Sequence, residues 1–468
     1  MSAASFRDPA GQVLVSPIDV VRTLRGKEGE CVLEFLASPC AEQLVASGRL
    51  VRSWRIESQS ATSSLPPGSV GVLGHSRVPF ISYPTEWPGI MLYEAGVVTL
   101  ACAREALGCG YVLKDASPYN VLFRGSSAIW VDVASFQPLR VGESLWRAHN
   151  QFSRTFLIPL LLLRQGVLPR AAFWHAPAGL DCRAAYRQLT WRARLSQPGL
   201  EHISLPTWLV RAGETHREAL LKSDAHGFAA LDGPESTSVL QQLQRLSKQF
   251  ARLAPAAEQS TWSNYQADAT PHDAAYLELK QSLLEQIFAA MPPGRVLDVG
   301  CNDGLFSLLA ASQGHDVVAI DQDPATVDAL FRSAKNLGAS VLPLVVDLTH
   351  PTPAMGFGGS EHESFLARAA ESFDLVLAMS LLHHLLVQSG APLRAVLATL
   401  LGCSRRTVVL EWVSPEDPMF RRIAAGRREL WASLSEQTLV EACASLGFVA
   451  NSRHVLSPTR TVFILGRT

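Results

Sequence analysis

Hydrophobic and polar positions follow the most regular pattern in the second half of the chain. Short apolar runs that suit buried strands alternate there with segments whose apolar residues have helical spacing. The last two runs are separated by a turn and read as a terminal hairpin. This order predicts an α/β fold with a doubly wound, Rossmann-like sheet and an antiparallel edge strand. The expected strands are 296–299, 317–320, 340–346, 373–379, 407–412, 448–456 and 461–465.

The first half has a different pattern, which predicts an α+β domain. Strand-like runs and one helix, expected over 30–47, precede residue 85. A helix over 89–107 is apolar around most of its circumference, so we expect it to be buried. Residues 140–250 read as mostly helical, and we expect their tryptophans to be core or interface residues rather than a base-stacking platform. These are Trp146, Trp174, Trp191 and Trp208.

The length of 468 residues favours two or three domains over one, and the 47% of hydrophobic residues can supply a large core. We place a first domain at 1–250, a polar linker at 251–271 and a second domain at 272–468. The net charge of −1 argues against strong general binding to nucleic acid. The eight cysteines show no C-x-x-C pair, which favours a reducing compartment.

Targeting signals are not evident in the sequence. The N-terminus does not read as a signal peptide, and the longest apolar run, 156–163, is too short to span a bilayer. We therefore expect a cytoplasmic protein without a membrane partner.

The most informative stretch runs from Gly294 to Gln322 and reads GRVLDVGCNDGLFSLLAASQGHDVVAIDQ. A buried strand leads through a glycine turn into a helix, and the next strand ends in Asp321. Such a turn lets a ligand approach the backbone and the free N–H groups of a helix. An acid at the tip of the second strand can accept hydrogen bonds from both hydroxyls of a ribose. The stretch therefore predicts a mononucleotide-type site.

The spacing Asp-x-Gly-x-x-x-Gly differs from the dinucleotide fingerprint Gly-x-Gly-x-x-Gly. An acid just before the first glycine suits a cationic ligand better than a pyrophosphate. The stretch resembles motif I of class I S-adenosylmethionine (SAM) methyltransferases, which implies that SAM is the cofactor. By that resemblance Asp298 and the glycine loop hold the methionine part, Asp321 the ribose and Asp347 the adenine amino group. The expected SAM-binding residues in the sheet domain are Asp298, Gly300, Asn302, Gly304, Asp321, Gln322, Asp347 and Met379.

Candidate bases follow the fourth and fifth strands. His383 and His384 lie just beyond the fourth strand, and either could remove a proton from a hydroxyl or an amine. Alternatively, one packs on adenine and the other caps a helix. Glu411, at the tip of the fifth strand, is a further candidate. We expect no metal, because no carboxylate is near the histidines in sequence.

Two aromatic residues of the linker, Trp262 and Tyr265, precede the sheet domain. A chain that enters there can fold over the carboxyl edge of the sheet as a lid. We therefore add both residues to the expected SAM site. We also expect the fragment 255–468 to bind SAM and methyl transfer to need the full chain.

A second resemblance lies in the first half. Asp115 is followed five residues later by Asn120 and then by a strand that ends near Asp132. This order resembles the catalytic loop and metal-binding segment of protein-kinase-like phosphotransferases, which implies nucleotide and Mg²⁺ contacts for these three residues. The chain departs from that pattern, since no glycine-rich loop or Ala-x-Lys strand is evident.

The order of the parts extends the resemblance over most of the chain. A Tyr-Pro-x-Glu-Trp-Pro segment and a Lys-Asp-Ala-Ser-x-Tyr-Asn loop precede Asp-Val-Gly-Cys-Asn-Asp-Gly. This arrangement is similar to a bacterial family of SAM methyltransferases, some of them labelled nodulation methyltransferases. The resemblance implies methyl transfer to an oxygen or nitrogen of a small molecule, saccharide, protein or RNA. The alternatives are an ATP-binding or phosphotransfer protein, or a substrate-recruiting module, with the methyltransferase domain secondary.

Overall fold

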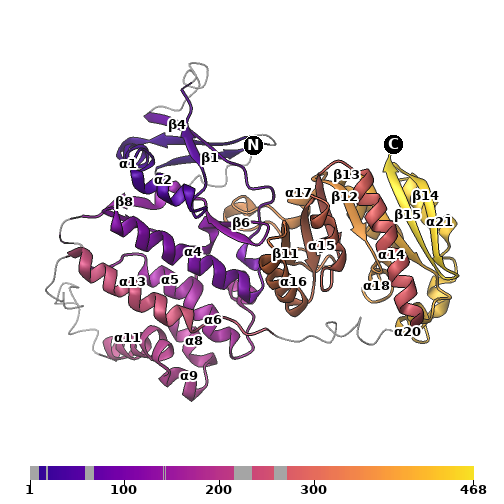
Figure 1. Cartoon of the computed structure of the whole chain (residues 1–468). Coiled ribbons are helices and arrows are strands. Elements are labelled where there is room, and N and C mark those ends of the chain that lie inside the picture. The colour runs from indigo at the N-terminus through magenta and orange to yellow at the C-terminus, as the bar shows by residue number, and fades with distance from the viewer. Residues whose placement is uncertain are drawn as a thin grey trace. The chain divides into compact units, whose positions relative to one another are not determined.

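The computed structural model describes residues 10–16, 19–57, 68–140, 142, 144–215, 235–257 and 271–468. The chain divides into two compact units (Figure 1). Unit 1 comprises Met1–Phe123 with Ala128–Ala256, and unit 2 comprises Arg124–Ser127 with Ala257–Thr468. In the part of the chain that the structure describes, no helix is both long and apolar enough to cross a membrane.

Unit 1 begins with a four-stranded antiparallel sheet in the order β1-β2-β4-β3. Helices α1 and α2 lie between β2 and β3 in the chain. The strands are β1 (Gly11–Val15), β2 (Val20–Arg25), β3 (Ser53–Arg55) and β4 (Ser69–His75), and the helices are α1 (Gly26–Leu36) and α2 (Pro39–Ala46).

The single helix expected over 30–47 is wrong, because Ser38 and Pro39 divide it. Pro39 is the first residue of α2, where its missing N–H costs nothing, whereas inside a helix it would remove a hydrogen bond. The Ser38 side chain caps the new helix by accepting from the Ala41 N–H at 3.4 Å.

The rest of unit 1 is mostly helical, as the sequence predicts. Helix α4 (Gly89–Gly108) is buried over most of its length. Short strands follow it: β5 (Tyr111–Leu113), β6 (Val121–Arg124), β7 (Ser127–Trp130) and β8 (Phe136–Pro138). The later helices are α5 (His149–Phe152), α6 (Ile158–Leu163), α7 (Pro169–His175), α8 (Cys182–Gln188), α9 (Trp191–Leu195), α10 (Gln197–Gly199), α11 (Leu205–Thr215) and α13 (Glu235–Ala251).

Short 3-10 and π turns complete unit 1. The 3-10 turns are η1 (Pro84–Glu86), η2 (Pro118–Asn120) and η3 (Val133–Ser135), and the π turns are η4 (Ser153–Leu157) and η5 (Leu200–Ser204).

Unit 2 is built on a seven-stranded sheet in the order β11-β10-β9-β12-β13-β15-β14. The first five strands in this order are parallel, and β15 is antiparallel to both of its neighbours. This confirms the predicted doubly wound sheet with an antiparallel edge. The strands are β9 (Arg295–Val299), β10 (Asp316–Asp321), β11 (Val341–Val345), β12 (Phe373–Ala378), β13 (Ser404–Val413), β14 (Phe448–Ser457) and β15 (Arg460–Arg467).

The helices of unit 2 precede the first strand or lie between successive strands in the chain. They are α14 (Pro271–Ala290), α15 (Leu305–Ser312), α16 (Pro324–Leu337), α17 (Phe365–Ala369), α18 (Leu382–Val387), α19 (Leu393–Gly402), α20 (Pro418–Ala424) and α21 (Glu436–Ala444), with 3-10 turns η6 (Phe357–Gly359) and η7 (Arg428–Trp431).

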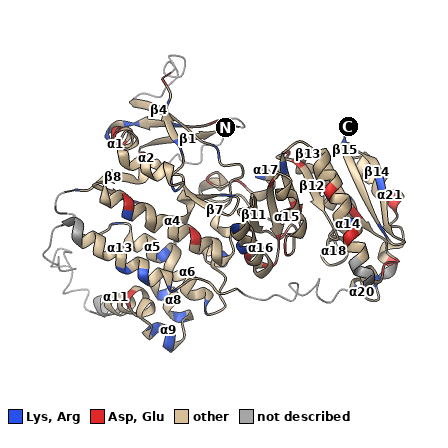
Figure 2. Ribbon diagram, in the orientation of Figure 1, with Lys and Arg blue, Asp and Glu red and all other residues tan. Residues whose placement is uncertain are grey.

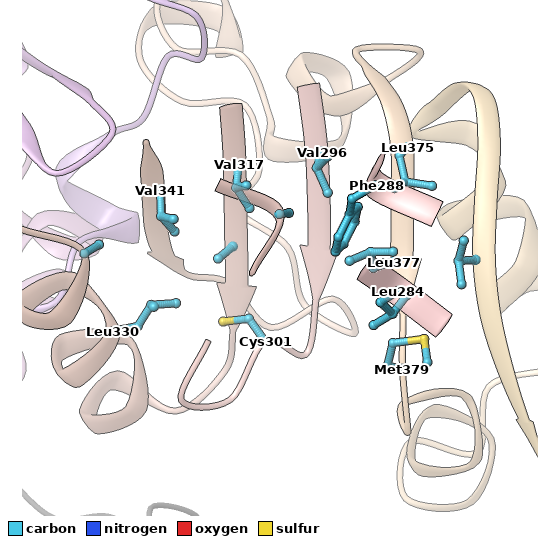
Figure 3. Packing of buried hydrophobic residues seen from close by; sticks show 14 of the residues in the cluster. Leu284, Phe288, Val296, Cys301, Val317, Leu330, Val341, Leu375, Leu377 and Met379 are labelled. Carbon is cyan, nitrogen blue, oxygen red and sulfur yellow. The ribbon is translucent and has the colours of Figure 1, made fainter. Parts of the chain in front are cut away.

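The core of unit 2 lies between the sheet and α14, α15 and α16. Val296, Val317, Val341 and Leu375 come from four neighbouring strands and point to one face of the sheet, where Phe288 of α14 packs (Figure 3). The strands are buried on both faces, which explains their continuous apolar runs. Strand order reverses between β9 and β12, so the crevice at their carboxyl ends is the expected ligand site.

Candidate active site at the carboxyl edge of the sheet

A cavity of about 800 Å³ opens at the carboxyl ends of β9, β10, β11 and β12. Its volume suits a nucleoside-sized ligand. Many of the residues expected to bind SAM line it: Gly300, Asn302, Asp321, Gln322, Asp347 and Met379, together with His384. Trp262 and Tyr265 lie outside the described residues.

The glycine loop after β9 is shaped by two left-handed glycines. Gly300 has φ +73°, and a Cβ there would stand 3.1 Å from the Leu381 side chain. Gly304 has φ +83° and precedes α15, and a Cβ there would stand 2.1 Å from the Leu330 side chain. Only glycine meets both demands without displacing its neighbours. Asn302 between them also has a positive φ, 49°, which asparagine tolerates.

Asp321 ties this loop to the end of β10. Its carboxylate accepts from the Asn302 N–H at 3.0 Å and from the Asp323 N–H at 2.9 Å. Burial raises the pKa of Asp321, and these backbone hydrogen bonds oppose the rise. The side chain is thus fixed in the cavity wall, where each oxygen has remaining lone pairs for a ligand hydroxyl.

An unpaired acceptor in this wall supports the fit of the predicted cofactor. The Asn302 Oδ1 atom is buried and has no hydrogen-bond partner among the described residues. A buried amide oxygen without a partner costs about 1–3 kcal/mol, which a ligand donor would recover. The amino group of a bound SAM is such a donor, so the loop residues and Asp321 fit the cofactor.

Asp347 lies across the cavity, after β11. It accepts from the Thr349 N–H at 2.8 Å and the Thr349 hydroxyl at 2.6 Å. Burial opposes its ionisation, but the hydrogen bonds from Thr349 and His350 hold the pKa of Asp347 below its usual value. A charged carboxylate at this place can accept from the exocyclic amine of adenine.

Asp298 and Gly304 do not line the cavity, although the sequence places both in the loop motif. Asp298 is almost fully buried, and the Ser307 hydroxyl donates to it at 2.6 Å. Burial raises the pKa of Asp298 to about 6. Its contact with Ser307 joins β9 to α15, the two elements that flank the glycine loop, so Asp298 stabilises this loop without lining the cavity.

Replacing Asp298 by Asn is expected to change how stability depends on pH. The pKa of Asp298 is raised from 3.8 to about 6 in the folded chain, so its ionisation costs stability as the pH rises through this window. The cost reaches about 3 kcal/mol above the window and is absent below it. The introduced asparagine carries no charge, so the melting temperature of Asp298→Asn should rise relative to wild type between about pH 4 and pH 7. A constant difference across this range would show that Asp298 does not titrate there.

The two histidines differ in their access to the cavity. His384 lines it, whereas His383 does not and is almost fully buried. Burial lowers the pKa of His383 to about 3, and its Nδ1 atom has no partner within the described part of the chain. Burial also lowers the pKa of His384, opposed by a hydrogen bond with Gln388. Both rings are therefore neutral near pH 7, and His384 is the one that can meet a ligand.

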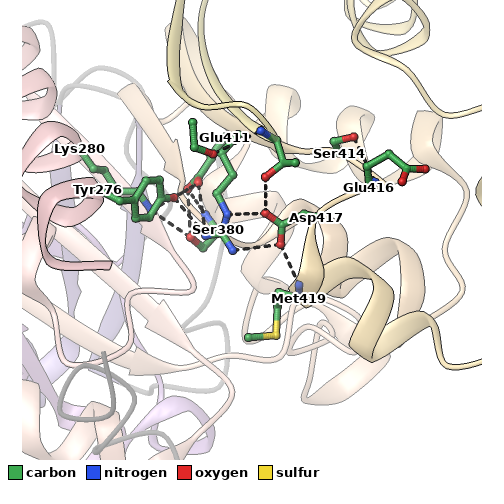
Figure 4. A network of polar contacts seen from close by, with 11 residues as sticks. Tyr276, Lys280, Ser380, Glu411, Ser414, Glu416, Asp417 and Met419 are labelled. Atoms are coloured by element: carbon green, nitrogen blue, oxygen red, sulfur yellow. Dashed lines mark hydrogen bonds and ion pairs between the residues drawn. The ribbon is translucent and has the colours of Figure 1, made fainter. Parts of the chain in front are cut away.

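Glu411 lies in a buried polar network beside the cavity (Figure 4). It accepts from the Ser380 N–H at 2.8 Å and the Ser380 hydroxyl at 3.0 Å, and Lys280 Nζ lies 2.7 Å from the same carboxylate oxygen. The other oxygen accepts from the Tyr276 hydroxyl. Although burial opposes ionisation, Lys280 holds the pKa of Glu411 below its usual value. This arrangement argues against Glu411 as the general base.

The network extends to the terminal hairpin through Arg460. Its guanidinium donates to both carboxylate oxygens of Asp417, at 2.9 and 3.2 Å, and to the Tyr276 hydroxyl at 3.2 Å. Ser380, with a strained φ of 51°, lines the cavity two residues after the end of β12. Buried charges thus fix the backbone at the cavity's edge. The sequence gives one hint of this, because Tyr276 and Lys280 are four residues apart on one helix face.

In unit 1 the structure brings two of the three kinase-like candidates together. Asn120 Nδ2 donates to the Ser135 hydroxyl at 3.4 Å, and that hydroxyl donates to Asp132. Asp132 also accepts from Arg22 of β2 at 2.7 Å, a residue that the sequence interpretation missed. Burial opposes its ionisation, but Arg22 holds the pKa of Asp132 below its usual value. The third candidate, Asp115, follows β5 in the chain. The described residues contain no group of three or more Asp, Glu, His or Cys side chains that could hold a metal ion.

Comparison with known proteins agrees with the methyltransferase fold of unit 2. A family model described as a methyltransferase domain matches residues 271–450. The nodulation protein NoeA of Rhizobium meliloti (strain 1021) is 30% identical over 470 residues, which cover 100% of this chain and 96% of that protein.

Other known proteins match only part of this chain. The Escherichia coli O-antigen chain terminator bifunctional methyltransferase/kinase WbdD is 26% identical over 36% of this chain and 21% of its own length. A WbdD crystal structure gives a TM-score of 0.32 at 21% identity, over 44% of this chain and 42% of that one. The full-length match confirms the predicted resemblance to nodulation methyltransferases: the chain belongs to the family of the nodulation protein NoeA, and its second unit is a SAM-dependent methyltransferase domain.

Proposed function

We propose that the protein transfers a methyl group from SAM to an oxygen or nitrogen atom of an acceptor that binds at the carboxyl edge of the unit 2 sheet. The observation that carries this proposal is the cavity wall formed by the glycine loop and Asp321. Bound SAM supplies an activated methyl group on a sulfonium. The protein must then orient the acceptor and accept its proton.

Each part of the cavity wall has a role in this proposal. Asp321 accepts from the ribose hydroxyls and Asp347 from the adenine amine. Asn302 Oδ1 accepts from the amino group of the methionine part, which Gly300 lets approach the backbone. Leu381 and Met379 exclude water beside the bound ligand. The role of Trp262 and Tyr265 in a segment that covers the ligand stays a prediction.

His384 is the general base in this proposal, because its ring is neutral and lines the cavity. Replacing it by Asn should lower the turnover number about 100-fold and leave the dissociation constant of SAM within about twofold. His383→Asn is the matched control, since this neighbouring ring does not line the cavity. Equal losses of turnover in the two variants, or a loss of SAM affinity in His384→Asn, would contradict the role.

The acceptor can be sought with radiolabelled SAM. The full chain should transfer labelled methyl groups into one fraction of a cell extract, and Asp321→Ala should transfer far less into the same fraction. Equal labelling by the wild type and by Asp321→Ala would refute the proposed site. Absence of label in every fraction, with SAM bound, would refute methyl transfer to a component of that extract.

Phosphotransfer by unit 1 is the second candidate. The contact of Asn120 and Asp132 with one Ser135 hydroxyl favours it, because both are expected Mg²⁺ contacts. The ion pair between Asp132 and Arg22 opposes it, since a cation already neutralises the carboxylate. Titration of the full chain with ATP and Mg²⁺ distinguishes these two interpretations. Binding of ATP by the wild type that is lost in Asp132→Asn would support phosphotransfer.

A further inference from the structure

The helical end of unit 1 combines exposed apolar side chains with a strong excess of positive charge. Residues 182–210 and 238–256 contain seven Arg and Lys residues and a single acid, Glu201. The whole chain, in contrast, has a net charge of −1. Figure 2 shows Lys and Arg on α8 and α9 in this region.

The exposed apolar side chains form two stripes at helical spacing. Trp191 and Leu195, four residues apart on α9, are 66% and 58% exposed. Leu205, Trp208 and Leu209 of α11 repeat the spacing and are 43%, 39% and 58% exposed. Residues at i, i+3 and i+4 share one helix face, so each helix presents apolar groups on one side. Of the tryptophans expected to be core or interface residues, Trp146 is therefore in the core, whereas Trp191 is not.

Tyr186 of α8 contacts both of the helices that carry these stripes. The Trp208 indole N–H donates to the Tyr186 hydroxyl at 3.3 Å. Arg194 of α9 donates to the Tyr186 carbonyl at 2.9 Å, and its guanidinium lies 4.1 Å from the centre of the tyrosine ring. Helices α9 and α11 are thus anchored to the same residue.

A cationic groove adjoins the α9 stripe. It has a volume of about 280 Å³ and is lined by Arg245 and Lys248 of α13, by Arg252 directly after that helix and by several glutamines. One of these, Gln197, begins α10 two residues after Leu195 and accepts from Arg252 at 3.0 Å. Glu201 pairs with Arg245 at 2.8 Å, so the groove keeps an excess of positive charge.

We propose that this surface, defined by Trp191, Leu195, Trp208 and Leu209 with the groove of Lys248 and Arg252, binds the face of an anionic lipid bilayer. The groove would receive a negatively charged headgroup, while the tryptophans and leucines enter the boundary of the acyl region. Leucine side chains gain nothing from a nucleic acid, which offers phosphates and base faces but no apolar interior, so the combination favours a membrane over RNA. Binding at the interface requires no spanning helix, although the sequence led us to expect no membrane partner.

Sedimentation of the full chain with lipid vesicles tests this proposal. The chain should sediment with vesicles of phosphatidylcholine mixed with phosphatidylglycerol and stay in solution with phosphatidylcholine alone. Lys248→Gln combined with Arg252→Gln should weaken partitioning on the order of tenfold or more, because each cation near such a surface contributes a several-fold gain. Trp191→Ser combined with Leu195→Ser should weaken it at least as much.

Matched controls come from unit 2, where Leu337 is 71% exposed and Arg422 is exposed on α20. Leu337→Ser and Arg422→Gln should partition like the wild type, and all variants should keep its melting temperature and its SAM affinity. Equal binding of wild type to both kinds of vesicle, or equal loss in the control variants, would overturn the proposal. So would binding to single-stranded RNA without binding to anionic vesicles.

Discussion

Replacing Lys280 by Met should lower the free energy of unfolding of unit 2 by about 3–5 kcal/mol, the largest loss we expect from a single substitution. The reason is electrostatic. Glu411 is fully buried, and Lys280 Nζ at 2.7 Å lies closer to its carboxylate than the Arg460 guanidinium does at 4.0 Å. Removing the ammonium leaves a carboxylate in the interior that must either stay charged without its partner or take up a proton.

The pH dependence of this loss has a definite sign. The pKa of Glu411 is lowered in the folded chain, so the pair contributes stability above the unfolded value of 4.5 and loses it as the pH falls. The difference between Lys280→Met and wild type should therefore shrink in acid. Urea unfolding followed by the fluorescence of unit 2, compared at neutral and acidic pH, measures both effects.

Two further variants sharpen the comparison. Lys280→Met combined with Glu411→Leu removes both charges and should recover much of the stability, since replacing a buried ion pair by apolar groups is often nearly neutral. Arg421→Met breaks an exposed pair with Glu416 and should cost at most about 1 kcal/mol. A Lys280→Met variant as stable as Arg421→Met would show that the network does not hold the cavity's edge.

Replacing Asp321 by Ala should weaken SAM binding by about 1–3 kcal/mol, which corresponds to about 5- to 150-fold in the dissociation constant. The substitution leaves the ribose hydroxyls without their acceptor. It also frees the Asn302 and Asp323 N–H groups that Asp321 holds at 3.0 and 2.9 Å, so the glycine loop loses its tie to β10. Isothermal titration calorimetry of the folded variant measures the change.

Asp316→Ala is the matched control, because Asp316 starts the same strand that Asp321 ends. Its carboxylate is exposed and accepts from the Ser340 hydroxyl at 2.7 Å, away from the cavity. Affinity for SAM should stay within about twofold of wild type in this control. Equal affinities for Asp321→Ala and Asp316→Ala would remove Asp321 from the proposed site.

The sheet and the cavity wall could be predicted from the sequence because their signals are local. Buried parallel strands read as unbroken apolar runs, and the spacing of Asp298, Gly300 and Gly304 marks a strand-to-helix turn. Acids at strand ends meet at one edge of a parallel sheet, which explains why Asp321 and Asp347 line the same cavity.

The buried network could not be predicted, since its members have no local relation in the chain. Lys280 and Glu411 are 131 residues apart, and only the strand order brings the end of β13 next to α14 and Ser380. The same limit applied to Arg22 and Asp132, which are 110 residues apart. A pattern of residue types also does not tell which face of a strand end borders a cavity. Asp298 accordingly faces Ser307 instead of the cavity.

Calorimetric titration of the full chain with SAM is the most direct test of the central claim, that the carboxyl edge of the unit 2 sheet binds this cofactor. We expect saturable binding of one SAM per chain, competed by S-adenosylhomocysteine and weakened in Asp321→Ala but not in Asp316→Ala. A folded chain that releases or absorbs no heat with SAM at several temperatures, and that SAM does not protect against thermal unfolding, would contradict the claim.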